Sequence, residues 1–395
     1  MKYYLCHLEN ESGVALITGL VIMVLLTAIG TYAIHMTEIE ETVSANLKAS
    51  KQALFLADAG LEMGRQQLRA STAIPPLPAN FTQALASGST SVTFTITPQV
   101  PAFSYTLAMQ SVSIVGNASK TLQALVTKTY DLSDSAIALR GNEADSTFTG
   151  NAFSVDGRDY DHVTGALSGG TMQYGITVPT VARQTDVNNA LSAQQQDNII
   201  GTAVPGLTAS IGVSPWLTSS AADSLGDALC DAAPAANKPP NIPTDGSYSP
   251  PANANWGTRA SPQVYCVTGV GTPGTMSMDI NGNFSGVGVL VVRDADLVIN
   301  GAFHFEGLIL VTGAKVGFGL LGGGNKDVYG SVIINETSTD GPSFREEIIQ
   351  GSSHLRYSRS ALNIARQLMP AAVMASIIAT LPATVEQVSW SEVNK

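Results

Sequence analysis

Apolar positions in the first seventy residues follow a helical pattern that starts as an uncharged run. Val14 to Ile34 contains no charged residue, and a helix of that length covers about 31 Å, the thickness of a bilayer core. Apolar residues then recur at multiples of three to four positions: Ile39, Val43, Leu47, Leu54, Ala57, Leu61 and Leu68. Pro75 and Pro76 end the pattern. It predicts one helix from about Val14 to Leu68. The N-terminal half of this helix is apolar all round and the C-terminal half is amphipathic. These halves are called its lower and upper parts.

Beyond the prolines the pattern changes to the two-residue alternation of strands. Ser91 to Thr97 places an apolar side chain at every second position, as do the first four residues of Ser111 to Val115. A third strand is predicted from Thr121 to Tyr130, after a turn at Gly116 and Asn117. These segments predict a small antiparallel sheet packed on the upper part of the helix.

A repeated motif organises the chain after about residue 135. INGNFSGVGVLVV begins at Ile280 and INGAFHFEGLILV begins at Ile299, while weaker copies begin at Tyr329 and Phe148. The later copies are spaced by roughly 20 residues, as expected for coils of a parallel solenoid whose stacked turns share one core. An antiparallel sandwich with similar hairpins is the alternative.

The region between the first and the later copies, residues 179–262, is expected to be an irregular insert. Further elements are predicted by local pattern: a helix from Thr185 to Ile199 capped by Thr185 or Asp186, a helix from Ser219 to Leu229, a surface loop from Lys238 to Asn255, a helix from Ser358 to Leu368, and a closing strand at Val388 to Trp390.

The charge balance limits the classes of partner. Only 13% of the 395 residues are charged and the formal net charge is -11. No basic patch is present that could displace counterions from phosphates, so the sequence disfavours nucleic acid as a partner.

Two of the three cysteines, Cys230 and Cys266, lie in the body of the chain. If the body lies outside the cytoplasm, they could form a disulfide that closes a loop of about 37 residues. The alternative is two unpaired buried thiols. No cysteine and histidine spacing suggests zinc.

Three groups of residues are candidates for a metal, nucleotide or catalytic site. Asp156, Asp159 and Asp161 could supply oxygen ligands to calcium, although an ordinary solvated turn fits them as well. Gly317, Gly319 and Gly322 form a GxGxxG string without a following helix pattern, so we interpret it as a flexible corner rather than a dinucleotide site. His162, His304 and His354 lack the context of any catalytic motif. The sequence therefore predicts no enzyme and no cofactor beyond the calcium candidate.

The segment GVALITGLVIMVLLTAIGTYAIHMTEIEETVSANLKASKQALFLADAGLE resembles the N-terminal region of PilX-type pilus assembly proteins. The resemblance rests on Gly13 before the apolar start, the acidic cluster after the run, Asn46, and FLADAGLE. It implies that a prepilin peptidase cuts between Gly13 and Val14 and that the new N-terminus is methylated. Major pilins carry Glu at the fifth position after the cut, where this chain has Thr18. A subunit without that buried carboxylate suits a tip or a rare position.

Together these features predict an α+β, mostly β protein with a transmembrane helix, a small pilin-like antiparallel sheet and a Gly-rich β-solenoid or β-helix-like domain. The expected division is a leader over residues 1–13, a stem helix over 14–70, a sheet over 71–134 and a β-rich domain over 135–395.

The resemblance implies a minor pilin of a type IV pilus, anchored by one span in the inner membrane with its body in the periplasm and later outside the cell. Its expected partners are other pilins, the prepilin peptidase, the assembly platform and a tip adhesin. The alternatives are a tip pseudopilin of type II secretion and a membrane-anchored module that binds polysaccharide or another surface.

Overall fold

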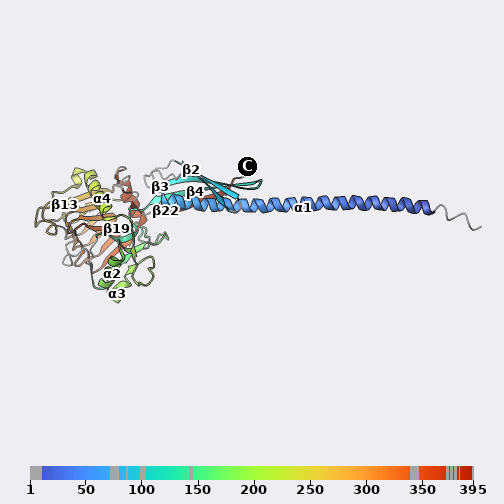
Figure 1. Cartoon of the computed structure of the whole chain (residues 1–395). Coiled ribbons are helices and arrows are strands. Elements are labelled where there is room, and N and C mark those ends of the chain that lie inside the picture. Colours follow the sequence, from blue (N-terminus) through green and yellow to red (C-terminus); the bar gives the residue numbers. More distant parts are fainter. Residues whose placement is uncertain are drawn as a thin grey trace, which may run out of the picture.

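A computed structural model of the chain describes residues 11–71, 80–85, 88–97, 104–141, 146–338, 347–370, 373, 377, 380, 381 and 383–393. Figure 1 shows a long helix, a small sheet lying along its upper part, and a larger β domain beyond its C-terminal end. This order agrees with a long apolar helix followed by a mostly β body that includes an antiparallel sheet.

Helix α1, Glu11–Ala70, is continuous. It starts three residues before the predicted start and ends two residues after the predicted end. At the C-terminal end of α1, the Lys128 ammonium group donates hydrogen bonds to the carbonyl oxygens of Leu68 and Ser71, both 2.5 Å away. A cation at this position satisfies carbonyl groups that have no partner within the helix. The last turn of α1 is therefore fastened to the sheet.

The small sheet is antiparallel and has the strand order β1-β2-β3-β4-β22. Its strands are β1 Phe81–Leu85, β2 Gly88–Thr97, β3 Ser104–Val115, β4 Ala118–Tyr130 and β22 Ala383–Glu392. One face packs on α1 and buries Val92, Leu107 and Met109 against Ala57 and Leu61. The three strands predicted from alternation lie within β2, β3 and β4.

Two glycines let this sheet approach α1 closely. A Cβ atom added to Gly60 would lie 2.3 Å from Ser111 Oγ and 2.4 Å from Thr90 Oγ1, and one added to Gly64 would lie 2.3 Å from Met109 Sδ. Such distances leave no room for a methyl group unless these side chains or the sheet shift. The apolar stripe read from the sequence omitted both glycines, because glycine adds no hydrophobic signal.

Replacing Gly60 by alanine is expected to lower the free energy of unfolding by about 1–3 kcal/mol, because an added methyl group overpacks the contact between helix and sheet. Urea unfolding of the detergent-solubilised chain would measure it. Gly30→Ala is the matched control, since nothing lies within 4 Å of a Cβ at that position. Equal stability of the two variants would contradict the close packing.

The larger domain (Figure 1) is built from parallel strands that form two sheets. The six-stranded sheet has the order β11 Ser247–Tyr248, β14 Ser277–Ile280, β16 Asp296–Ile299, β18 Phe318–Leu320, β20 Glu347–Gln350 and β6 Ser146–Thr149. From β14 to β21, successive strands belong alternately to this sheet and to the other one.

The other sheet has eleven strands. They are β5 Ser135–Leu139, β7 Ser154–Asp156, β8 Tyr174–Val178, β9 Ile199–Ile200, β10 Ile211–Val213, β12 Ala254–Trp256, β13 Gln263–Thr268, β15 Phe284–Arg293, β17 Phe303–Gly313, β19 Lys326–Glu336 and β21 Ser353–Tyr357. The pairings between these strands are parallel, so the antiparallel sandwich was the wrong alternative.

The repeated motifs lie in register on neighbouring coils. Phe284 is opposite Phe303, and Ile280 is opposite Ile299. The copy that begins at Phe148 also joins the stack, because β6 pairs with β20 and β7 pairs with β21 although about 200 residues separate them. One turn of the stack therefore comes from a distant part of the chain.

A ladder of glycines bends the long strands at one level. Gly288, Gly307 and Gly330 are in register and have φ values of +130°, +135° and +139°. A side chain in this conformation is strained. Before the ladder one strand face carries the half-buried Ser285, His304 and Asp327. After it, α4 Ser219–Ala232 and α5 Arg359–Gln367 pack against the long strands. Burial on both faces explains the unbroken aliphatic runs that follow each glycine.

The predicted insert, residues 179–262, needs correction. It contains helices α2 Val181–Ala190 and α3 Ala193–Gln196 and the short helix η1 Ala235–Asn237, but its strands β9, β10 and β12 belong to the eleven-stranded sheet. The predicted helix from Thr185 to Ile199 was misplaced. Thr180 caps α2 by accepting from the Arg183 amide, and the chain leaves the helix at Leu191.

The boundary of the β-rich domain at residue 395 is also wrong. β22 pairs with β4 over Glu392↔Leu122 to Ala383↔Tyr130, so the end of the chain returns to the small sheet. Val388 and Trp390 lie in this strand, as predicted, but the sheet that it closes is the small one. The larger domain is thus inserted between two neighbouring strands.

Candidate functional site

The lower half of α1 is an apolar surface without a partner in the described part of the chain. Val14, Leu16 and Ile17 are 65 to 75% exposed. Among the described residues, α1 is the one helix long and apolar enough to cross a membrane, by length and composition alone. This half of the helix projects beyond both sheets (Figure 1). These features are consistent with a membrane anchor.

The helix passes through the predicted cut between Gly13 and Val14 without a break. Four residues further on, the Thr18 hydroxyl donates to the carbonyl oxygen of Val14 at 2.8 Å. Its polar group is therefore satisfied within the helix. A carboxylate at this position would instead need a partner from outside, because charge is costly in an apolar surrounding.

Above the apolar run, a groove of about 630 Å³ follows one face of α1. Its apolar wall consists of Ile39, Val43, Leu47 and Phe55, which are 51 to 72% exposed. Lys48 and Lys51 also line it. The sequence placed Ile39, Val43 and Leu47 on the same stripe as Leu61, but the sheet covers only the upper part of that stripe.

The comparisons with known proteins identify this same segment of α1. The family model described as PilX N-terminal matches residues 12–62. Residues 12–62 are PilX-like. The resemblance read from the sequence is thereby confirmed, and the PilX-like segment contains Gly13, Val14, Thr18 and the whole apolar wall of the groove.

Comparisons over the rest of the chain add little. No curated protein matches the chain in sequence. Among solved structures, the competence-associated pilin ComZ from Thermus thermophilus is similar at 13% identity, with 87% of this chain and 98% of that chain covered and a TM-score of 0.30. A TM-score of 0.30 is too low to assign a shared fold, so the β domain is characterised by its own strand pairing.

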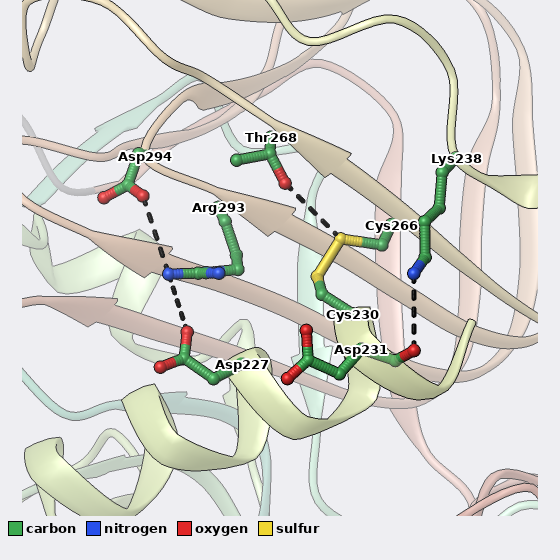
Figure 2. Close-up of a disulfide and its surroundings, with 8 residues drawn as sticks. All are labelled: Asp227, Cys230, Asp231, Lys238, Cys266, Thr268, Arg293 and Asp294. Carbon is green, nitrogen blue, oxygen red and sulfur yellow. Dashed lines mark hydrogen bonds and ion pairs between the residues drawn. A yellow bond between two sulfur atoms is a disulfide. The ribbon is translucent and has the colours of Figure 1, made fainter. Parts of the chain in front are cut away.

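Cys230 and Cys266 are joined by a disulfide that fastens α4 to β13 (Figure 2). Both residues are buried. Beside them, Arg293 lies 2.6 Å from an Asp227 carboxylate oxygen and 3.8 Å from one of Asp294. Helix α4 is therefore attached to the sheet by a disulfide and an ion pair, in addition to hydrogen bonds from Thr312 to Asp223 and from Asn335 to the Ser219 carbonyl oxygen.

Loss of this disulfide is expected to lower the free energy of unfolding by roughly 3–4 kcal/mol, because the bond closes a long loop in the unfolded chain. The Cys230→Ser, Cys266→Ser double variant and the parent treated with dithiothreitol should lose the same amount. Urea unfolding with and without reductant measures it. A reductant effect that persists in the double variant would contradict this assignment.

The three aspartates weighed for calcium do not converge. Asp156 accepts from the Arg158 side chain at 2.6 Å and from the Tyr160 hydroxyl at 2.7 Å, whereas Asp159 accepts from the Arg359 amide at 2.9 Å. Asp161 accepts from amides in its own turn. Within the described ranges, no group of three His, Cys, Asp or Glu residues could hold a metal ion. Calcium thus stays a prediction, one that this geometry does not favour.

The glycine string lies at a corner of the coil. Gly317 precedes the short strand β18, Gly319 lies within it and Gly322 follows it, so no helix begins here. The buried Lys326 ammonium group donates to the carbonyl oxygens of Gly322, Gly323 and Gly324, each at 3.3 Å. A dinucleotide site would present amide groups at a helix start instead.

His162 and His304 mark a polar cluster that the sequence did not predict. Its centre is Glu306 on β17, which is 2% exposed. The Arg259 guanidinium group binds both carboxylate oxygens at 2.7 and 2.8 Å, and His304 Nε2 lies 2.9 Å from Oε1. His162 Nε2 is 3.9 Å from Oε2. His354 lies apart from this cluster, with Nδ1 3.4 Å from Ser154 Oγ.

Burial alone would raise the pKa of Glu306, but hydrogen bonds from His304 and Arg259 and their charges outweigh it and lower the pKa from 4.5 to about 2. The carboxylate is thus kept ionised. Arg259 comes from the loop between β12 and β13 and also donates to the His162 carbonyl oxygen. Glu306 therefore joins two loops to the sheet.

Acid is expected to weaken the domain through Glu306. Because its folded pKa is lower than its unfolded pKa, its stabilisation is complete above pH 4.5 and is lost as the pH falls towards 2. The full loss amounts to about 3 kcal/mol. Urea midpoints between pH 6 and pH 2 measure it, with Glu306→Gln as the variant that lacks this step. Identical acid profiles would contradict the assignment.

Proposed function

We propose that the chain is a minor subunit of a type IV pilus, inserted by α1 and presenting its β domain outside the cytoplasm. The observation that carries the proposal is the coincidence of the PilX-like segment with the exposed half of α1. An apolar surface of this size needs either lipid or other helices around it. Transfer from the membrane into a bundle of like helices supplies the second environment.

In this proposal α1 waits in the inner membrane, a prepilin peptidase cuts between Gly13 and Val14, and the assembly platform moves the subunit into the filament. The β domain faces the periplasm and later the cell exterior, where the Cys230–Cys266 disulfide can persist. Other pilins are the partners of the groove on α1, and a tip adhesin is a further candidate. The role is structural, with no catalysis and no cofactor.

The β domain supports a terminal or rare position. We assign its parallel coils to a β-solenoid, a broad unit attached at one end of the stem (Figure 1). Such a unit on every subunit would crowd a repeating shaft. Thr18 agrees with this assignment, because it offers no carboxylate for the N-terminus of a neighbour.

A tip pseudopilin of a type II secretion system would have the same anchor and a large body. Neighbouring genes distinguish the two: a secretin with exported enzymes indicates secretion, whereas a retraction ATPase and adhesin genes indicate a pilus.

N-terminal sequencing of the protein from its native membrane tests the proposal. A methylated Val14 at the first position is expected. An intact Met1, or a cut after residue 35, would overturn it.

A further inference from the structure

We propose that the β domain binds a neutral polysaccharide in a cleft that crosses its coils. The cleft has a volume of about 330 Å³ and lies at the start of strands β12, β15, β17 and β19. Each coil contributes residues at the same level, so the cleft runs across the strands rather than along them. Polar side chains line the open side of the cleft, and buried aromatic side chains form its floor.

The upper lining consists of side chains that form hydrogen bonds. Asn253, Asn283, Ser285 and Asn325 line the cleft, and none of their side chains bonds to another residue in the part of the chain that the structure describes. An amide side chain both donates and accepts, as a sugar hydroxyl does. Three amides and one hydroxyl on one open surface are matched to a ligand rich in hydroxyl groups.

Two further side chains make a fixed wall. His304 is held by Glu306 at 2.9 Å, and Asp327 is held by Arg356 at 2.8 Å. Both line the cleft, and β17 and β19 place them opposite each other in register. Residues held in this way lose little rotamer freedom when a ligand binds. Phe284 and Phe303 lie beneath and are buried.

The geometry favours a polymer of sugars over a peptide or a nucleic acid. Neighbouring strands are spaced by about 4.8 Å, close to the length of one pyranose unit in an extended chain, so successive units meet equivalent groups on successive coils. The backbone groups of β15, β17 and β19 already bond to their neighbours, and the edge strand β12 is only three residues long, too short to hold a peptide strand firmly. The net charge of -11 opposes polyanions.

Titration calorimetry of the full chain would test this in lauryldimethylamine oxide, a detergent without a sugar headgroup. The probes are cello-, xylo- and chito-oligosaccharides of two to six units, with oligogalacturonate as the charged comparison. We expect at least one neutral series to bind, with affinity rising up to about four units, because four strands line the cleft. Absence of binding by every neutral series, or preference for oligogalacturonate, would overturn the proposal.

Substitution then locates the site. The Asn283→Ala, Asn325→Ala double variant is expected to bind about tenfold more weakly, the effect of losing two hydrogen bonds. Asn281→Ala is the matched control: it lies two residues from Asn283 but does not line the cleft, and it bonds to Asn300. Equal weakening in the control would overturn the proposal.

A second measurement needs no substitution. Hydrogen exchange in the presence of the hexasaccharide is expected to slow at the start of β15, β17 and β19 and to stay unchanged in the small sheet. Slowing confined to other segments would contradict the assigned cleft. Since these readouts do not depend on the N-terminus, they are independent of the proposed role in a pilus.

Discussion

Substituting valine for Gly13 is expected to leave the chain uncut in cells where the parent begins at Val14. A peptidase that cuts after glycine must bring its catalytic groups close to that backbone, and a β-branched side chain at this position blocks the approach. Cleavage should fail completely rather than in part. An uncut leader would also leave extra residues in the position where the filament core would form. Mass spectrometry of the membrane protein would detect the leader.

The control for this substitution is Gly19→Val, in the same helix but beyond the cut. Nothing lies within 4 Å of a Cβ at Gly19, so the substitution should leave processing intact. Both variants should insert into the membrane, which separates a processing defect from a failure to insert. If Gly13→Val were cut like the parent, the assigned cut would be wrong.

The second large effect is expected at Glu306, where lysine should unfold the β domain or lower its stability by about 3–5 kcal/mol. The change removes the buried carboxylate and places a cation beside Arg259 and His304, so the ion pair becomes a repulsion in a poorly solvated site. Near-ultraviolet circular dichroism and urea unfolding would report the loss. The small sheet and α1 do not contact this cluster and should keep their structure.

Glu306→Gln is the matched variant, since it keeps the shape and an oxygen acceptor for Arg259. It should lose less than the lysine variant because it adds no cation, and its deficit relative to the parent should shrink as the pH approaches 2. A lysine variant as stable as the glutamine variant would show that the added cation meets no repulsion from Arg259 and His304, which would contradict the assigned cluster.

Local patterns predicted much of this fold. The helix expected from Val14 to Leu68 is α1, and the helix expected from Ser358 to Leu368 is α5, capped by Ser358. The repeats at Ile280 and Ile299 predicted neighbouring segments with matching positions, and they lie in register on paired parallel strands. In each case the residues that form the pattern lie close to one another in the sequence.

Features that depend on distant pairs were not predictable in this way. Glu306 looked like one acidic residue in an aliphatic run, and only folding brings Arg259 and His162 to it. The return of β22 to β4 likewise joins segments about 250 residues apart. Nothing in the residues from Ala383 to Glu392 distinguishes a partner in the small sheet from one in the coils.

Caps and close approaches form a third group. Thr180 and Thr185 are both plausible helix caps by residue type. The first residue of α2, Val181, is 66% exposed, so no buried apolar position marks the start of the helix. Gly60 and Gly64 are silent in a hydrophobic count, yet they determine how near the sheet lies to α1. The absence of a side chain carries meaning only once the neighbouring surface is known.

The return of the chain through β22 has a mechanical consequence. The β domain is tied to the stem at both of its ends, through Tyr130 of β4 and Ala383 of β22, and these two residues are opposite each other in the sheet. A pull on the domain is thus shared between two adjacent strands and directed along their length. All the hydrogen bonds that hold the pair in the sheet then bear the tension together, as in a lap joint under shear, instead of opening one after another from an end.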